Sequence, residues 1–218
     1  MKPTRAAWLF AAGLAWLVLR GILVNAFPAL RAERIAQDGG IWLLIPLLSF
    51  VASLAAPVFF ISFLRHHSFA GRPVLRSLTL FAVVASVLSC GLVMVSLGAT
   101  AGVIDLGSGR TGVMDRWLPA VIPFLFVVSI FLFLFALARS SDLDPGLRSA
   151  ARVGAISTSI PILMILAWIG SSLFGVPAWY PAFSQGLVAK LLSLSAAAAL
   201  FWFLESFARR YDRDGDVG

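Results

Sequence analysis

Two basic residues, Arg20 and Lys190, stand inside hydrophobic stretches where a charge is costly. Arg20 interrupts the first such stretch, 7–30, and Lys190 lies in the last, 184–207. A cation within the hydrocarbon region is expensive and indicates a functional role unless its side chain reaches the headgroups. With a helical rise of 1.5 Å per residue, both cations lie roughly 9 Å from the same membrane boundary. They predict either an anion-binding site in the outer half of the molecule or a pair of snorkelling side chains.

Aromatic and small polar residues accompany both cations. Trp16 precedes Arg20 by one helical turn, a spacing that allows a cation–π contact. Ser193 shares a helix face with Lys190, which favours an orientation toward protein. An uncharged connection before the last stretch carries two aromatic residues between prolines, and we expect it to lie at the outer interface and close the site. The predicted ligand-binding residues are Arg20, Lys190, Trp16, Ser193, Trp179 and Tyr180.

The composition is that of a membrane protein. The 218 residues are 60% hydrophobic and 12% charged, and the mean hydropathy is +0.96. Soluble domains have about half their residues apolar and about a quarter charged. The net charge of +7 is spread over several connections, so membrane topology explains it better than nucleic-acid binding. The expected partner is therefore the lipid bilayer, with no nucleic acid.

Six hydrophobic segments are long enough to span a bilayer, which needs about 20 apolar residues. The connections between them are short, so no soluble domain is expected. The fold class that we predict is an all-α bundle of six transmembrane helices forming one domain, 1–207, followed by a short polar cytoplasmic tail, 208–218. The tail is expected to be disordered from Tyr211 on. The predicted segments are 7–30, 41–64, 76–100, 117–138, 152–174 and 184–207.

The distribution of lysine and arginine predicts the orientation. The N-terminus, the second and fourth connections and the tail together carry eleven basic residues. The alternate connections carry four, matched by nearby acidic residues. Basic connections stay in the cytoplasm, so both termini are expected inside (N-in/C-in). The predicted location is the inner (cytoplasmic) membrane of a bacterium, as a multi-pass protein.

Three sequence features predict how the helices pack. Ala7, Ala11 and Ala15 recur at four-residue spacing and predict a ridge for close helix approach. Pro57 predicts a kink in the second helix. The phenylalanine-rich segment 117–138 is hydrophobic on all sides, so we expect it at the periphery, facing lipid or a partner subunit.

Groups needed for much membrane chemistry are missing from the predicted spans. No aspartate or glutamate lies deep in a predicted helix, which argues against a carboxylate proton relay. The two histidines, His66 and His67, are adjacent at the end of a span and lack the spacing of a metal pair. The single cysteine, Cys90, allows no intramolecular disulfide. We therefore expect no cofactor, no metal site and no enzymatic activity.

The leading functional prediction is a protein that binds or transports a small anionic or amphipathic molecule, or a lipid, in the outer half of the bundle. One alternative is a non-catalytic accessory or assembly subunit with a membrane protein partner. The other is a membrane enzyme whose active site lies in its connections. In outline, with six helices, both ends inside and a small-residue ridge on the first helix, the chain is similar to the substrate-capture subunits of vitamin importers, without a matching binding motif.

Overall fold

The computed structural model describes most of the chain, and every regular element in the described part is an α-helix. The backbone is described for residues 1–26, 44–69, 71–101, 113–141, 143–174 and 187–214. Side chains are described for residues 1–23, 44–69, 71–99, 101, 121–141, 143–167 and 191–210.

Six spans in the described residues are long and apolar enough to cross a membrane, which confirms the all-α, multi-pass prediction. Five of the spans are single helices, and the second is made of two consecutive helices. The elements are α1 (Pro3–Ala26), α3 (Leu44–Ser53), α4 (Ala55–His66), α5 (Pro73–Thr100), α6 (Val113–Arg139), α7 (Pro145–Phe174) and α9 (Leu187–Asp214).

The second span is broken between Ser53 and Ala55, as the proline predicted. Pro57 has no N–H, so the carbonyl of Ser53, four residues earlier, loses its helical donor. The Cys90 thiol on α5 occupies that position, with its Sγ 3.1 Å from the Ser53 carbonyl oxygen. The break is therefore compensated by a hydrogen bond from the neighbouring helix.

The fifth span, helix α7, begins seven residues before the predicted start at 152, so that boundary was wrong. Asp144 is its N-cap: Oδ2 accepts hydrogen bonds from the backbone N–H of Gly146 at 2.6 Å and of Leu147 at 3.2 Å. Pro145 occupies the first helical position, where its missing N–H costs nothing. The arginines counted as loop residues in this region are thus helical.

The last helix, α9, also exceeds its predicted length. It continues to Asp214, so the expectation of disorder from Tyr211 was wrong as far as Asp214. An ion pair at the usual helical spacing lies near this end, with Nη2 of Arg209 2.5 Å from Oε1 of Glu205. The polar end of the chain therefore continues the last span as a helix.

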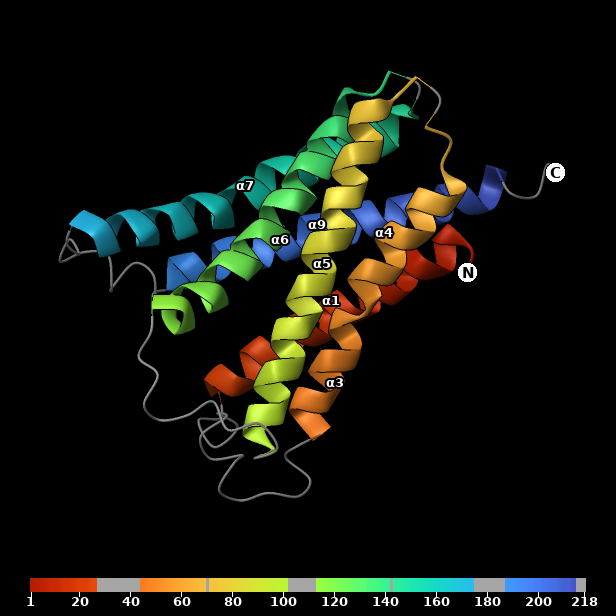
Figure 1. The fold of residues 1–218 in the computed structure, drawn as a ribbon. Helices are drawn as coiled ribbons and strands as arrows, with labels where there is room; N and C mark the ends of the chain where they lie inside the picture. The colour runs from red at the N-terminus through yellow and green to blue at the C-terminus, as the bar shows by residue number, and fades with distance from the viewer. Residues whose placement is uncertain (27–43, 70, 102–112, 142, 175–186, 215–218) are drawn as a thin grey trace.

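The spans form a closed ring that follows chain order (Figure 1). Each span packs against the one before and the one after it, and α9 packs against α1 to complete the ring. Successive spans run in opposite directions, so both chain termini lie at the same end of the molecule (Figure 1). The connections α4–α5 and α6–α7 lie at this end too. We call it the terminal end.

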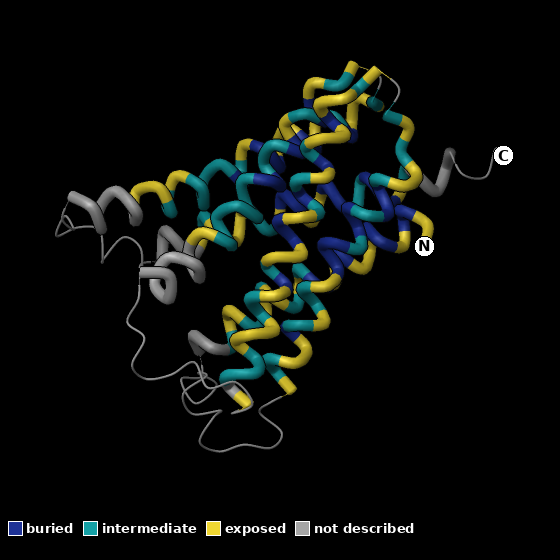
Figure 2. The backbone as a smooth tube through the Cα atoms, in the orientation of Figure 1, coloured by how far each residue is buried: buried dark blue, intermediate teal, exposed yellow. Residues whose placement is uncertain are grey.

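Buried residues concentrate toward the terminal end (Figure 2). Phenylalanines from several helices meet there: the ring of Phe59 lies 5.7 Å from that of Phe10 and 5.5 Å from that of Phe207. Phe133 of α6 stacks edge-on against Phe60 at 5.2 Å, and it is 1% exposed. The expectation that this segment lies at the periphery was wrong, because Phe133, Leu134 and Leu137 belong to the core and are at most 1% exposed, although Phe135 on another face is exposed.

The first helix makes its closest approach at a glycine. Ala7 and Ala11 of the predicted ridge are buried, whereas Ala15 is exposed. Gly13, which is not part of the predicted repeat, lies against the second span instead. A Cβ added there would lie 2.6 Å from the carbonyl oxygen of Ala52. The contact face of α1 therefore turns onto the break in the second span.

Candidate functional site

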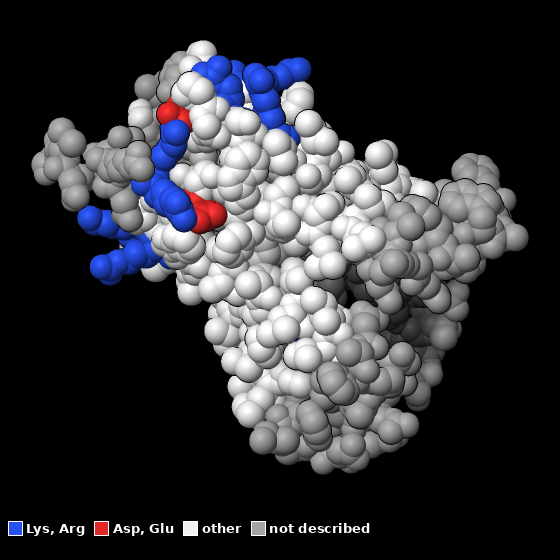
Figure 3. Space-filling view, turned by 180° about the vertical axis from the view of Figure 1, so that it is seen from behind, with Lys and Arg blue, Asp and Glu red and all other residues white. Residues whose placement is uncertain are grey.

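Basic side chains gather at the terminal end of the molecule (Figure 3). In this view the rest of the described surface is almost wholly uncharged. The end holds the start of α1, the α4–α5 and α6–α7 connections and the end of α9. The described basic residues in these segments are Lys2, Arg5, Arg65, Arg72, Arg76, Arg139, Arg148, Arg152, Arg209 and Arg210.

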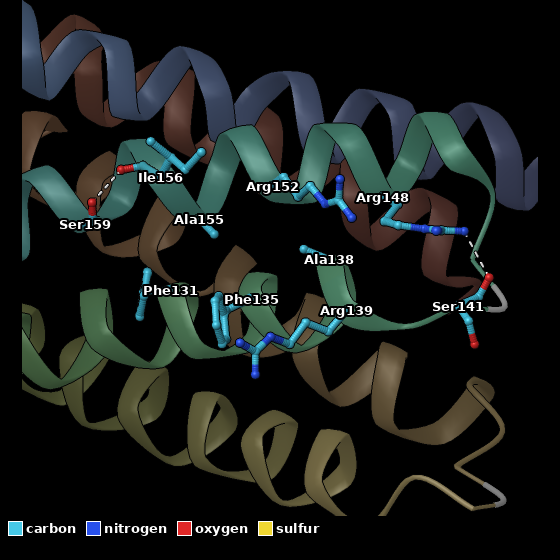
Figure 4. A pocket seen from close by; sticks show the side chains of 10 residues that line it. All are labelled: Phe131, Phe135, Ala138, Arg139, Ser141, Arg148, Arg152, Ala155, Ile156 and Ser159. Carbon is cyan, nitrogen blue, oxygen red and sulfur yellow. Dashed lines mark hydrogen bonds between the residues drawn. The ribbon is translucent and has the colours of Figure 1, made fainter.

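A groove of about 730 Å³ lies between α6 and α7 within this basic region (Figure 4). We call it the α6–α7 groove. Its volume falls within the range of about 300–1,000 Å³ that is typical of small-molecule sites. Three arginines line it at the terminal end, namely Arg139, Arg148 and Arg152. No carboxylate is among the described residues that line it.

Two of the three guanidinium groups are held in place by described neighbours. Arg139 turns back along α6, and its guanidinium carbon lies 4.3 Å from the centre of the Phe135 ring (Figure 4). Arg148 donates from Nη2 to the carbonyl oxygens of Ser141 at 2.9 Å and Leu143 at 3.0 Å. Each guanidinium has five N–H donors, so both groups keep donors that can face a ligand.

The third cation, Arg152, projects into the space between the two helices (Figure 4). Its side chain is exposed and makes no hydrogen bond or ion pair with any residue that the structure describes. It lies one helical turn beyond Arg148 on the same face of α7. The groove therefore presents one guanidinium that a ligand can engage without displacing a protein partner.

The deeper part of the groove is apolar. Phe131 lies on α6 two turns before Arg139, which at 1.5 Å per residue places it about 12 Å from that cation along the helix. Ala155 and Ile156 of α7 line the opposite wall, and Ile156 is 68% exposed. The site thus combines cations at the terminal end with an apolar wall that extends along the two spans, an arrangement that suits an amphipathic ligand.

The sequence-predicted site lies elsewhere in the molecule. Arg20 is on α1, partly exposed, six residues before the end of that helix. The side chains of Trp16 and Arg20 are both described, and they do not make the expected cation–π contact. Instead, the indole Nε1 of Trp16 donates to Ser49 Oγ on α3 at 3.3 Å. Trp16 therefore joins two helices.

The other predicted residues are described only in part. Lys190 is in α9, and its side chain lies outside the described residues. Ser193 is exposed on the same helix. Trp179 and Tyr180 lie outside the described residues altogether. α1 and α9 diverge toward the ends that hold Arg20 and Lys190 (Figure 1).

In the sequence, Arg139, Arg148 and Arg152 served only to predict the orientation of the chain in the membrane. A helical repeat on the first turns of α7 could have identified them: Arg148, Arg152, Ala155 and Ser159 follow the i, i+4, i+7, i+11 pattern of one helix face. The pattern was hidden because α7 was expected to begin only at 152. The wall on α6 follows the same kind of spacing, with Phe131, Phe135, Ala138 and Arg139 at i, i+4, i+7 and i+8, but within a segment that is hydrophobic on all sides.

Comparison with protein-family models, with curated proteins and with solved structures finds nothing that matches this chain. Among the described residues, no group of three or more histidine, cysteine, aspartate or glutamate side chains is placed to hold a metal ion. The functional argument therefore rests on the groove itself.

Proposed function

We propose that this chain is a multi-pass protein of a bacterial inner membrane that binds an anionic amphipathic molecule in the α6–α7 groove. The observation that carries the proposal is the juxtaposition of three arginines with an apolar wall in one groove of about 730 Å³. An anionic head engages the guanidiniums, and an apolar tail lies along Phe131 and Ile156.

The charge distribution supports an orientation with both termini in the cytoplasm. The described basic residues gather at the terminal end (Figure 3), and basic connections are retained on the cytoplasmic side. The groove then opens at the inner leaflet. Reporter fusions after Arg72 and after Arg139 are expected to read cytoplasmic, and an external reading from either would overturn this orientation.

The test of binding is native mass spectrometry of the full chain after extraction in mild detergent. Wild type is expected to retain an anionic lipid, and Arg152→Gln to lose most of it, because Arg152 is the groove cation with no described side-chain partner. Arg76→Gln is the matched control, because Arg76 is exposed at the same end of the molecule but does not line the groove. Equal lipid retention in all three proteins would contradict the proposal. A stoichiometric protein partner with no bound lipid would instead support the accessory-subunit alternative.

The same measurement tests the predicted outer site. Lys190→Ala and Arg20→Ala are expected to lower anion retention if these cations form the site that the sequence predicts. If both the outer site and the α6–α7 groove retain the same anion, the protein offers a binding position near each face of the membrane, which would favour transport over binding alone. Full retention in both variants would mean that the two side chains snorkel to the headgroups.

A further inference from the structure

The positive charge of the α6–α7 groove exceeds what a singly charged headgroup neutralises. The groove is lined by three guanidiniums, and the described lining holds no carboxylate. The α6–α7 connection holds two aspartates: Asp142 lies outside the described residues, and Asp144 is engaged elsewhere, capping α7 and pairing with Arg210 of α9. The charges at the terminal ends of the helices packed against α6 and α7 are mostly positive too: Arg72 just before α5, Arg76 on α5, and Glu205, Arg209 and Arg210 on α9.

We propose that the α6–α7 groove selects a lipid whose headgroup is a phosphate monoester, over lipids whose phosphate is a diester. This inference rests on the proposed function and names the ligand class of the same site. A phosphate monoester carries between about −1.5 and −2 charges near neutral pH and presents three acceptor oxygens, whereas a diester carries one charge. Three guanidiniums are therefore better matched in charge and in acceptor oxygens by the monoester than by the diester.

The three arginines have different parts in this selection. Arg139, held over Phe135, and Arg148, held on two backbone carbonyls, form a fixed positive rim whose position does not depend on the ligand. Arg152 closes on the phosphate by charge-assisted hydrogen bonds, which are stronger than neutral ones. Because two of the three cations are already ordered, binding orders one long side chain instead of three.

The apolar wall distinguishes a lipid from a free phosphate. The distance of about 12 Å along α6 from Arg139 to Phe131 is spanned by an acyl chain and not by a phosphate ion. Ile156 is 68% exposed on that wall, so in the absence of a bound chain it faces bulk lipid. The occupant is therefore a membrane lipid of the leaflet at the terminal end.

The experiment places the full chain in nanodiscs of phosphatidylcholine with a minor amount of either phosphatidic acid or phosphatidylglycerol at about pH 8. Native mass spectrometry then measures the fraction of protein that carries each anionic lipid. Wild type is expected to retain phosphatidic acid about fivefold more than phosphatidylglycerol, a preference equivalent to about 1 kcal/mol. Arg152→Gln is expected to abolish the preference, and Arg76→Gln, outside the groove, to keep it.

Two further arms separate the sources of phosphate. Ile156→Asn, at an exposed position, is expected to weaken phosphatidic acid retention because it makes the chain-binding wall polar. Millimolar glycerol phosphate is expected to leave retention unchanged, and displacement of the lipid by it would overturn the lipid assignment. Groove-dependent retention without any preference between the two lipids would overturn this inference and leave the proposed function standing. Retention that does not respond to Arg152→Gln for either lipid would overturn both.

Discussion

The two halves of the six-helix ring differ in how completely their helices pack. In the terminal half of α9, Phe203, Leu204 and Phe207 are at most 1% exposed, whereas Leu191 in the far half is 54% exposed. On α5 the same contrast holds, with Ala82 fully buried in the terminal half and residues beyond position 93 largely exposed. One half is a closed core, and in the other half many of the described apolar side chains face outward.

The difference shows what holds helices together in lipid. Because lipid tails are as apolar as leucine, helices associate only where their surfaces fit closely or exchange hydrogen bonds. The terminal half combines alanines on α1, such as Ala7, with phenylalanines on α4, α6 and α9, so large and small side chains interdigitate. In the far half the described side chains are mostly branched aliphatics, which contact lipid as well as they contact protein. The α6–α7 groove lies on the closely packed half, which gives its arginines a rigid frame.

The largest expected effect comes from Gly13, where the closely packed half of α1 ends. In Gly13→Ala the added methyl would lie 2.6 Å from the Ala52 carbonyl oxygen, which belongs to backbone and cannot rotate away. Separating α1 from the second span is expected to cost about 3 kcal/mol. The measurement is the midpoint of thermal unfolding in mild detergent.

Gly21→Ala, on the same helix, is the control for that measurement. An added methyl at Gly21 meets no heavy atom within 4 Å, and alanine favours the helix more than glycine does. Its midpoint is expected to match or slightly exceed that of wild type. If the two variants unfold at the same temperature, α1 does not pack on the second span as described.

A smaller effect is expected at the connection between α6 and α7. Asp144 both caps α7 and pairs with Arg210 of α9, so Asp144→Ala is expected to lower the free energy of unfolding by about 1–2 kcal/mol. Arg210→Gln removes only the exposed ion pair and is expected to cost at most about 1 kcal/mol. Glu205→Gln, which breaks an exposed pair within α9 alone, is the control. A loss in Arg210→Gln as large as that in Asp144→Ala would show that the interhelical pair, and not the cap, holds this connection.

The smallest effect concerns His67, at the connection between α4 and α5. Burial, with a contribution from the positive charge of Arg72, lowers the pKa of His67 below its usual value of 6.5. As the pH falls below 6.5 the unfolded chain takes up a proton before the folded one does, so stability decreases as the pH falls from there toward the lower pKa of the folded protein. His67→Phe keeps an aromatic ring against Phe63, stacked at 4.6 Å in wild type, and is expected to reduce this dependence. An unchanged pH profile of the unfolding midpoint would mean that His67 does not contribute to it.

The sequence determined the class of fold because hydropathy is a local property. A span needs only enough consecutive apolar residues, and the predicted segments coincide with the six spans of the structure to within several residues. The break at Pro57 was predictable for the same reason, since proline lacks an N–H in any context. The start of α7 could also have been read from Asp144 and Pro145, which form a local cap and first-turn signal.

Tertiary structure alone decided which apolar surfaces meet. Segment 117–138 is hydrophobic on every side, so its sequence does not indicate which face packs against protein and which faces lipid. In the structure, Phe133 is 1% exposed within the ring. The α6–α7 groove depends on two helices approaching each other, and Arg139 and Arg152 become one site only because the connection between them is short and capped. Their charge was plain in the sequence, whereas their convergence required the packing of the whole terminal half.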